Sequence, residues 1–181
     1  MSDRIRIEGR AFVIAGDVES DAILAPRHHG APDAAAHCLA NRAPGFVQGG
    51  PYPVLIATGL FGLGLPRPPV SAALRAAGAR AVIAPSIAPL LVENALNGAE
   101  LLTLAAAPQA WPETGEIVSV TFDATGATLA WPGHESRWPG GLPGWALAGQ
   151  SWGEVLRARA EAAGGLAALQ EARRQAARAA R

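Results

Sequence analysis

The alternation of hydrophobic and polar positions along the chain predicts a mixed α/β protein with a central sheet. Residues 4–14 alternate loosely between polar and apolar side chains, which predicts a strand or hairpin that leads into a turn at 16–17. Residues 54–58, with the sequence VLIAT, form the kind of short β-rich apolar run that is buried on both faces of a sheet. Residues 79–86, ARAVIAPS, predict a second strand of this kind.

One helix is predicted before this second buried strand in the sequence, and another after it. Pro68 and Pro69 suit the first turn of a helix, and Gly78 stops the pattern VSAALRAA that follows them. Residues 87–97, IAPLLVENALN, predict another helix, which ends at Gly98. The order strand, glycine loop, helix, strand, helix is typical of a βαβ-type unit.

The segments outside this unit have a different character. Residues 23–50 are rich in proline, glycine and alanine and predict a loop with one short helix. Residues 116–131 alternate around a turn at 123–126, which predicts an antiparallel hairpin. Residues 131–145, WPGHESRWPGGLPGW, read as a proline- and glycine-rich loop. The hairpin means that the sheet is mixed or that there are two sheets.

The C-terminal part of the chain predicts helix interrupted by two glycines. Residues 154–181 are rich in alanine, arginine and glutamate, and the helical pattern breaks at Gly164 and Gly165. Beyond the break the large apolar side chains are only Leu166 and Leu169. We therefore predict one domain over residues 1–163 and a partly detached helical tail over residues 164–181.

Composition and charge narrow the function. Half of the 181 residues are hydrophobic, enough to bury a sizeable core, and 15 arginines balance 15 acidic residues. This balance gives no electrostatic reason to expect nucleic acid or an anionic membrane as partner. The N-terminus lacks the apolar core of a signal peptide and no apolar run reaches membrane-spanning length, so we expect a cytoplasmic protein.

Cysteine and histidine content argues against a metal centre in this chain. Cys38 is the only cysteine, which excludes an intramolecular disulfide and a four-cysteine zinc or iron–sulfur site. His28, His29, His37 and Cys38 offer metal-ligand atoms within a short span, but their spacing fits no recognised zinc pattern. We predict that the chain itself holds no metal.

Three stretches, in this order, resemble the small subunit of 3-isopropylmalate dehydratase, the swivelling domain of the aconitase superfamily. Residues 17–28, DVESDAILAPRH, resemble the family's early Asp-Thr-Asp loop, with Asp21 on its second aspartate. Residues 60–69, LFGLGLPRPP, fall on the Asn-Phe-Gly-Cys-Gly-Ser-Ser-Arg-Glu-His motif. The similarity extends to about Leu104, and in the third stretch four residues keep the family's spacing: Ser86, Asn94, Asn97 and Gly98.

The resemblance implies a fold, a partner and an activity. Such subunits adopt a three-layer β/β/α fold with a mixed sheet and cap a large subunit that carries a [4Fe-4S] cluster. Together the two subunits remove and re-add water on a hydroxy-dicarboxylate. The resemblance therefore places the cluster in a partner and leaves this chain without a cofactor of its own.

The glycine-containing loop departs from the family at the positions that carry proton chemistry. The two motif serines, one of which takes a proton in the family, correspond to Leu65 and Pro66, and neither residue has a side-chain oxygen. Arg67 matches the family's arginine and can still offer a bidentate fork to a carboxylate. Gly62 and Gly64 still permit close approach of a ligand to the backbone.

The predicted substrate-binding residues are thus Arg67, Gly62, Gly64 and Asp21, and no catalytic residue is assigned. Each residue also has a plainer interpretation. Arg67 is then a surface arginine, Gly62 and Gly64 only allow a tight turn, and Asp21 forms a solvated turn.

Two functions remain open. The chain is either the small subunit of a hydro-lyase or a non-catalytic relative that binds a carboxylate ligand or a protein partner. In a variant of the first function, the partner or a histidine such as His28 supplies the base.

Overall fold

The computed structural model describes residues 4–64 and 68–179, and two sheets organise this part of the chain. The large sheet is mixed: its first four strands are antiparallel to one another, and the strands from β1 onward are parallel. Its strand order is β10 (His134–Pro139), β9 (Gly126–Trp131), β8 (Ile117–Asp123), β1 (Arg4–Ile14), β3 (Val54–Ala57), β5 (Ala81–Ala84) and β7 (Leu102–Ala105).

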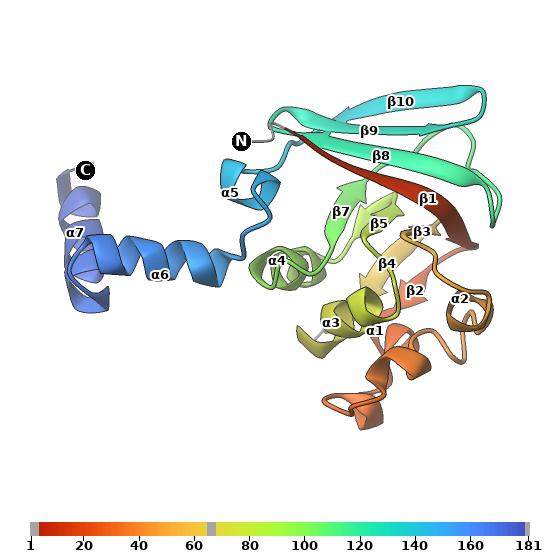
Figure 1. The fold of residues 1–181 in the computed structure, drawn as a ribbon, viewed down its shortest axis with the longest axis horizontal. Coiled ribbons are helices and arrows are strands. Elements are labelled where there is room, and N and C mark those ends of the chain that lie inside the picture. The colour runs from red at the N-terminus through yellow and green to blue at the C-terminus, as the bar shows by residue number, and fades with distance from the viewer. Residues whose placement is uncertain (1–3, 65–67, 180–181) are drawn as a thin grey trace.

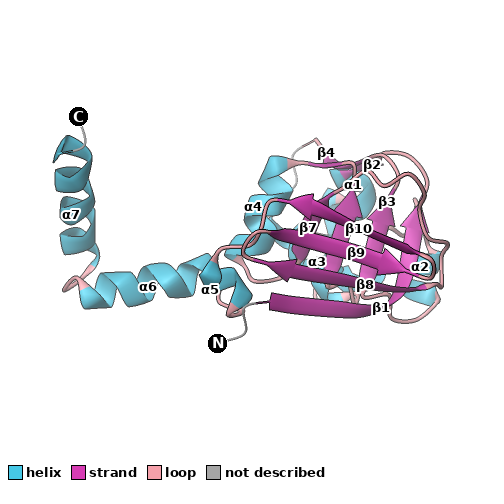
Figure 2. Cartoon of the chain, turned by 90° about the horizontal axis from the view of Figure 1, so that it is seen from above, coloured by secondary structure: helices cyan, strands magenta, loops and turns pink. Residues whose placement is uncertain are grey.

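Strand β1 joins the two halves of the large sheet, because its two ends pair with different partners. Its first part lies antiparallel to β8, with Arg4 opposite Asp123 and Arg10 opposite Ile117. Its last four residues lie parallel to β3, with Ala11 opposite Val54. The sheet curls at this change of partner, so that β8, β9 and β10 cross over the parallel strands (Figures 1 and 2).

A second sheet contains three short parallel strands, in the order β2 (Val18–Glu19), β4 (Leu60–Leu63) and β6 (Ser86–Ile87). Each strand follows a strand of the large sheet after a short interruption. Two hydrogen bonds join the segments that follow β1 and β3: Thr58 N donates to Ile14 O at 3.0 Å and Gly59 N donates to Gly16 O at 3.2 Å.

Helices follow the strands of the small sheet. Helix α1 (Ser20–Ile23) follows β2, α3 (Pro68–Ala76) follows β4 and α4 (Pro89–Asn97) follows β6. The remaining helices are α2 (Gly45–Gln48), α5 (Gly144–Leu147), α6 (Trp152–Ala162) and α7 (Leu166–Ala179), with the 3₁₀ turns η1 (Pro26–His28) and η2 (Ala34–His37).

The buried side chains show that the molecule has three layers. Strand β3 is buried along its whole length, as its apolar run predicted. Leu55 and Ala57 belong to a core that also contains Leu74 of α3 and Leu91 of α4, whereas Val54 and Ile56 pack with residues of β8 and β9 on the other face. Successive side chains of a strand point to opposite faces, so the parallel strands lie between a β layer and a helical layer. The predicted three-layer β/β/α fold with a mixed sheet is confirmed.

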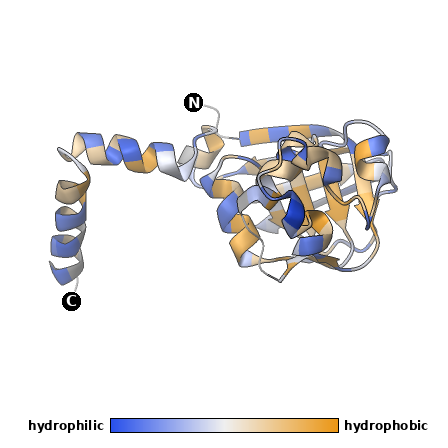
Figure 3. Ribbon diagram, turned by 90° about the horizontal axis from the view of Figure 1, so that it is seen from below, coloured by the Kyte–Doolittle hydropathy of each residue, from blue (hydrophilic) through white to orange (hydrophobic). Residues whose placement is uncertain are grey.

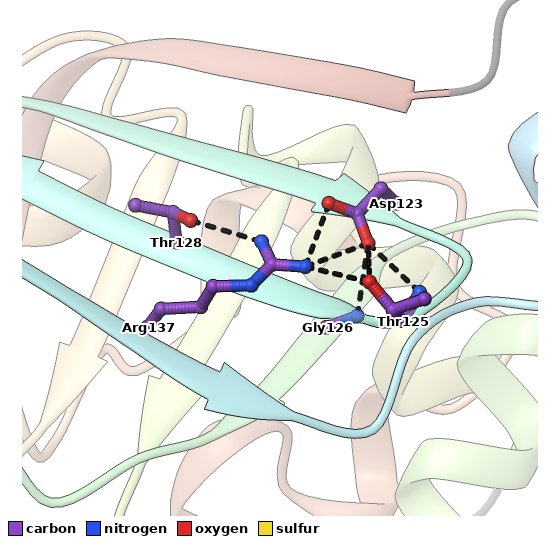
Figure 4. Close-up of polar contacts among 5 residues, drawn as sticks. All are labelled: Asp123, Thr125, Gly126, Thr128 and Arg137. Atoms are coloured by element: carbon purple, nitrogen blue, oxygen red, sulfur yellow. Dashed lines mark hydrogen bonds and ion pairs between the residues drawn. The ribbon is translucent and has the colours of Figure 1, made fainter.

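A cluster of polar and charged side chains links the end of β8 to the edge strand β10 (Figure 4). Asp123 Oδ1 accepts hydrogen bonds from Thr125 N at 2.8 Å and from Gly126 N at 3.0 Å. Arg137 of β10 donates to both carboxylate oxygens of Asp123, each at 2.9 Å. These bonds, those from Thr125 first, lower the pKa of Asp123.

Helices α6 and α7 extend away from the layered body (Figures 1 and 2). Helix α6 starts with a capping box, in which Glu154 N donates to Ser151 Oγ and Ser151 N donates to the Glu154 carboxylate. The predicted helix break is confirmed, since Gly164 and Gly165 have φ angles of +85° and +120°. Alanine and polar residues make up most of α7 (Figure 3), and a domain boundary at 163–164 stays a prediction.

Two segments differ from their sequence-based predictions. Residues 60–63, predicted as loop, form β4, and residues 134–139 form β10 instead of a loop. β10 is an edge strand whose residues are not buried, so it lacks the apolar alternation that predicts a strand. No helix in the described part of the chain is long and apolar enough to cross a bilayer.

Candidate functional site

The candidate site lies at the edge where the three strands of the small sheet end and three helices begin. β2 leads into α1, β4 leads toward α3, and β6 leads into α4. Helix α1 contacts both β4 and α3, and α3 contacts α4 (Figure 1). Because the carboxyl ends of parallel strands share one edge, segments far apart in the sequence meet there, as ligand sites in α/β proteins commonly require.

Gly62 holds β4 tightly against the start of α4. Its φ angle is +82°, and a Cβ atom at this position would lie 2.9 Å from Leu91 Cδ2 and 3.4 Å from the Cβ of Ala88. Next to it, Ala88 N donates to Phe61 O at 2.9 Å. Gly62 is therefore required both for its backbone conformation and for close packing, and its predicted role in ligand contact stays a prediction.

Gly64 differs from Gly62, because a Cβ atom at this position would contact none of the described atoms. Its φ angle is +94°, and none of the described atoms lies within 4 Å of the position that a Cβ would take. The loop continues into Leu65, Pro66 and Arg67, which lie outside the described residues. The predicted carboxylate contact of Arg67 thus has no structural description.

Asp17, to which the sequence assigned only a turn, connects the first and second strands of the site. Its Oδ1 accepts a hydrogen bond from Leu60 N at 2.7 Å, and Thr58 Oγ1 accepts one from Gly16 N at 2.9 Å. Gly59 must be glycine at this crossing, since a Cβ would lie 2.2 Å from Asp17 Oδ1. In the sequence, only the adjacent residues Thr58 and Gly59 pointed to a turn after β3. That this turn pairs with Asp17 is seen only in the tertiary structure.

Asp21, the remaining predicted site residue, lies on α1 and is exposed. Because α1 contacts both β4 and α3, the fold brings the element that carries Asp21 to the same edge as the strand that carries Gly62. An exposed carboxylate here is compatible with a ligand contact and equally with the solvated turn, so its role stays a prediction.

His28 and His37 form a small stack. The rings of His28 and His37 lie 3.7 Å apart with an interplanar angle of 14°, and His37 Nε2 lies 3.1 Å from Asp33 Oδ2. Arg27 Nε donates to His28 Nε2 at 3.0 Å. Burial, followed by the charges of His37 and Arg27, lowers the pKa of His28, which favours a neutral ring at pH 7.

The described residues do not fit an iron–sulfur cluster. Cys38 is buried, and its burial raises the pKa of the thiol to about 12, so that it is protonated at neutral pH. A cluster needs several thiolate ligands, and this chain contains one cysteine. In the described part of the chain, no three side chains of the metal-binding types are placed to hold a metal ion.

Prolines at the helix starts limit what this edge offers to an anion. Backbone N–H groups at a helix N-terminus bind anions, but Pro68 and Pro69 open α3 and Pro89 opens α4, and none of the three has an N–H. In α4, the N–H groups of Leu91 and Val92 already donate to Ala88 O. These prolines reduce the number of backbone donors at this edge, and the sequence supplies Arg67 as a side-chain cation.

A solved structure shares this architecture. 3-Isopropylmalate dehydratase (LeuD) from Methanocaldococcus jannaschii superposes on the chain with a TM-score of 0.63 at 24% sequence identity, covering 98% of this chain and 100% of that one. On its fold the chain thus falls in the class of three-layer β/β/α proteins with a mixed sheet. No family model matches the sequence.

Curated relatives define the family. The small subunit of 3-isopropylmalate dehydratase from Saccharolobus islandicus is 32% identical over 158 residues, which cover 84% of this chain and 89% of that protein. The small subunit from Metallosphaera sedula is 31% identical over 128 residues, which cover 68% of this chain and 79% of that protein. That of Moorella thermoacetica is 34% identical over 97 residues, 50% of this chain and 57% of its own length. The chain belongs to the family of 3-isopropylmalate dehydratase small subunits.

Proposed function

We propose that the chain is the small subunit of a hydro-lyase that caps an iron–sulfur large subunit and helps to bind a hydroxy-dicarboxylate. The observation that carries this proposal is the edge of the small sheet, where Gly62 and Gly64 with positive φ angles present β4 beside the starts of α3 and α4. The names of the relatives, each a small subunit of a dehydratase, support the same role.

The division of labour follows from the ligands that this chain lacks. With one buried thiol of raised pKa it cannot carry a cluster, so the Lewis-acid chemistry of a cluster, which binds and removes a hydroxyl group, would come from the large subunit. The contribution of this chain is then to position one carboxylate through Arg67 and to shield the site from water.

Proton transfer is the step that this chain is poorly equipped to perform. Leu65 and Pro66 occupy the positions of the family's serines and carry no proton-accepting atom. Loss of a general base typically lowers the rate by about two to four orders of magnitude. We expect weak turnover of isopropylmalate unless the large subunit or a neutral histidine such as His28 accepts the proton.

A second function is favoured by the same loop. The hydroxyl-free residues at 65 and 66 and the prolines at 68 and 69 remove both the base and two backbone donors, which suits a non-catalytic relative that binds a carboxylate or a protein partner. Such a relative would keep the fold and Arg67 but would not catalyse the reaction.

Co-expression with an iron–sulfur large subunit separates the two functions. Formation of a stable complex and a low but measurable hydratase activity would support the hydro-lyase subunit, and Leu65→Ser/Pro66→Ser should raise that activity. Absence of any complex with every large subunit tested would contradict the capping role and favour the non-catalytic relative. Robust wild-type turnover would refute the inference that the base is lost.

Calorimetry on the same complex tests the arginine. Arg67→Ala should weaken dicarboxylate binding by about 1.5–3 kcal/mol, the usual contribution of a hydrogen bond to a charged group. Arg157→Ala provides the matched control, because Arg157 is an exposed arginine on α6, outside the candidate site. Unchanged affinity in Arg67→Ala would refute the binding role.

A further inference from the structure

A cavity opens at the opposite end of the parallel strands from the glycine loop. Its volume is about 490 Å³, within the range of small-molecule sites. It lies where β3, β5 and β7 begin, and residues directly before or at these starts line it: Pro53, Arg80 and Leu102. Arg75, in the last turn of α3, and Glu100, after the end of α4, complete the helical side of the wall.

The charged residues of this wall do not neutralise one another. Arg6 and Glu8 of β1 pair together, which leaves Arg75, Arg80 and Glu100 as the other charged residues of the wall. Among the described residues, neither Arg75 nor Arg80 has a carboxylate within ion-pair distance. Glu100 likewise has a buried carboxylate oxygen, Oε2, without a hydrogen-bond partner. Two positive charges and one negative charge remain, so the wall has one excess positive charge.

Arg75 and Arg80 both line this cavity, one in the last turn of α3 and the other directly before β5. Burial, and then the charge of Arg80, lowers the pKa of Arg75. The last turn of a helix favours a cation, which explains one arginine at the end of α3 but not the uncompensated pair. An anion bound in the cavity would compensate this excess positive charge, and guanidinium N–H groups can donate to a carboxylate in bidentate geometry.

Most of the remaining wall is apolar, and Gln150 adds one polar side chain. Ile5 and Ile7 of β1, Leu96 of α4, Leu101, Leu102 and Ala146 of α5 line the cavity. A strongly hydrated inorganic anion would gain nothing from this surface, whereas a hydrocarbon chain buried against it would gain about 0.8 kcal/mol per CH₂ group. The single excess positive charge favours one negative charge over two.

We propose that this cavity binds a small aliphatic monocarboxylate, with its carboxylate on Arg75 and Arg80 and its hydrocarbon chain against Leu96, Leu102 and the isoleucines of β1. The site is separate from the strand edge that carries Gly62 and Gly64, because it lies at the other ends of the strands. It therefore needs neither a large subunit nor a hydroxy-dicarboxylate.

Titration calorimetry of the full chain with hexanoate tests the proposal. Wild-type protein should bind hexanoate saturably, and it should bind acetate, hexylamine and inorganic phosphate more weakly. Arg75→Gln/Arg80→Gln should weaken hexanoate binding by at least about tenfold, the smallest loss expected when one charge-assisted hydrogen bond is removed. Arg157→Gln, which removes the same charge from an exposed site on α6, should bind hexanoate as the wild type does.

The outcomes separate the proposal from its competitors. No saturable binding of hexanoate, or equal binding of hexylamine, would overturn it. A preference for phosphate would replace the monocarboxylate with an inorganic anion and would also overturn it, as would an equal loss of affinity in Arg157→Gln. Circular dichroism of each variant shows whether the fold is intact. Because the chain is measured alone, failure here leaves the proposed hydro-lyase role untouched.

Discussion

Substitution of Gly62 by alanine would test how tightly β4 is held against α4. Alanine at this position meets two obstacles: the φ angle of +82°, which side chains rarely adopt, and the closeness of Leu91 Cδ2, 2.9 Å from the new Cβ. The side chain of Leu91 is fully buried, so it has little room to move away.

The two obstacles have separate magnitudes. A non-glycine residue in a left-handed conformation costs about 1–2 kcal/mol, and overpacking a buried contact typically costs about 1–3 kcal/mol more. Gly62→Ala should therefore lower the free energy of unfolding by about 2–5 kcal/mol. Gly64→Ala is the matched control, because its φ angle is +94° but none of the described atoms would contact its Cβ. It should cost only the conformational part, about 1–2 kcal/mol.

Urea denaturation followed by circular dichroism measures both values, with equal m-values as the condition for comparing midpoints. A Gly62→Ala variant as stable as Gly64→Ala would refute the packing argument. A Gly62→Ala variant as stable as the wild type would refute the backbone argument as well.

Three further predictions concern the tail, the hairpin and the thiol. Deletion of residues 166–181 should lower the melting temperature little, because Leu166 is 61% exposed; loss of cooperative unfolding would show that α7 is packed. The folded-state pKa of Asp123 is lowered, so its stabilisation is present above its unfolded pKa of about 4 and is lost as the pH falls further. The difference in unfolding free energy between wild type and Asp123→Asn should accordingly be constant above about pH 5 and shrink below about pH 4, and a difference independent of pH would contradict this. Cys38 should react with a thiol reagent slowly in the native protein and rapidly in urea, because it is buried and its pKa is about 12; rapid native labelling would disprove its burial.

The sequence by itself determined the elements whose side chains are buried in a regular pattern. Residues 54–57 and 81–84 are apolar on both faces because each strand lies between two layers, and this continuous pattern predicted them as strands. The hairpin of β8 and β9 was predicted from its alternation and its turn, and the helix break from Gly164 and Gly165. The family's spacing, from Asp21 to Gly98, could also be read without coordinates.

Only the tertiary structure decided the elements and sites that depend on distant partners. β2, β4 and β6 are strands of two to four residues, too short to show a period, and they exist because each pairs with the next. β10 is exposed and is held by its pairing with β9 and by the bond from Arg137 to Asp123. The cavity beside Arg75 and Arg80 draws its wall from β1, α3, α4 and α5, and no local pattern records such a meeting. Local side-chain patterns report whether a residue is buried, whereas pairing and cavities depend on which distant segments the chain brings together.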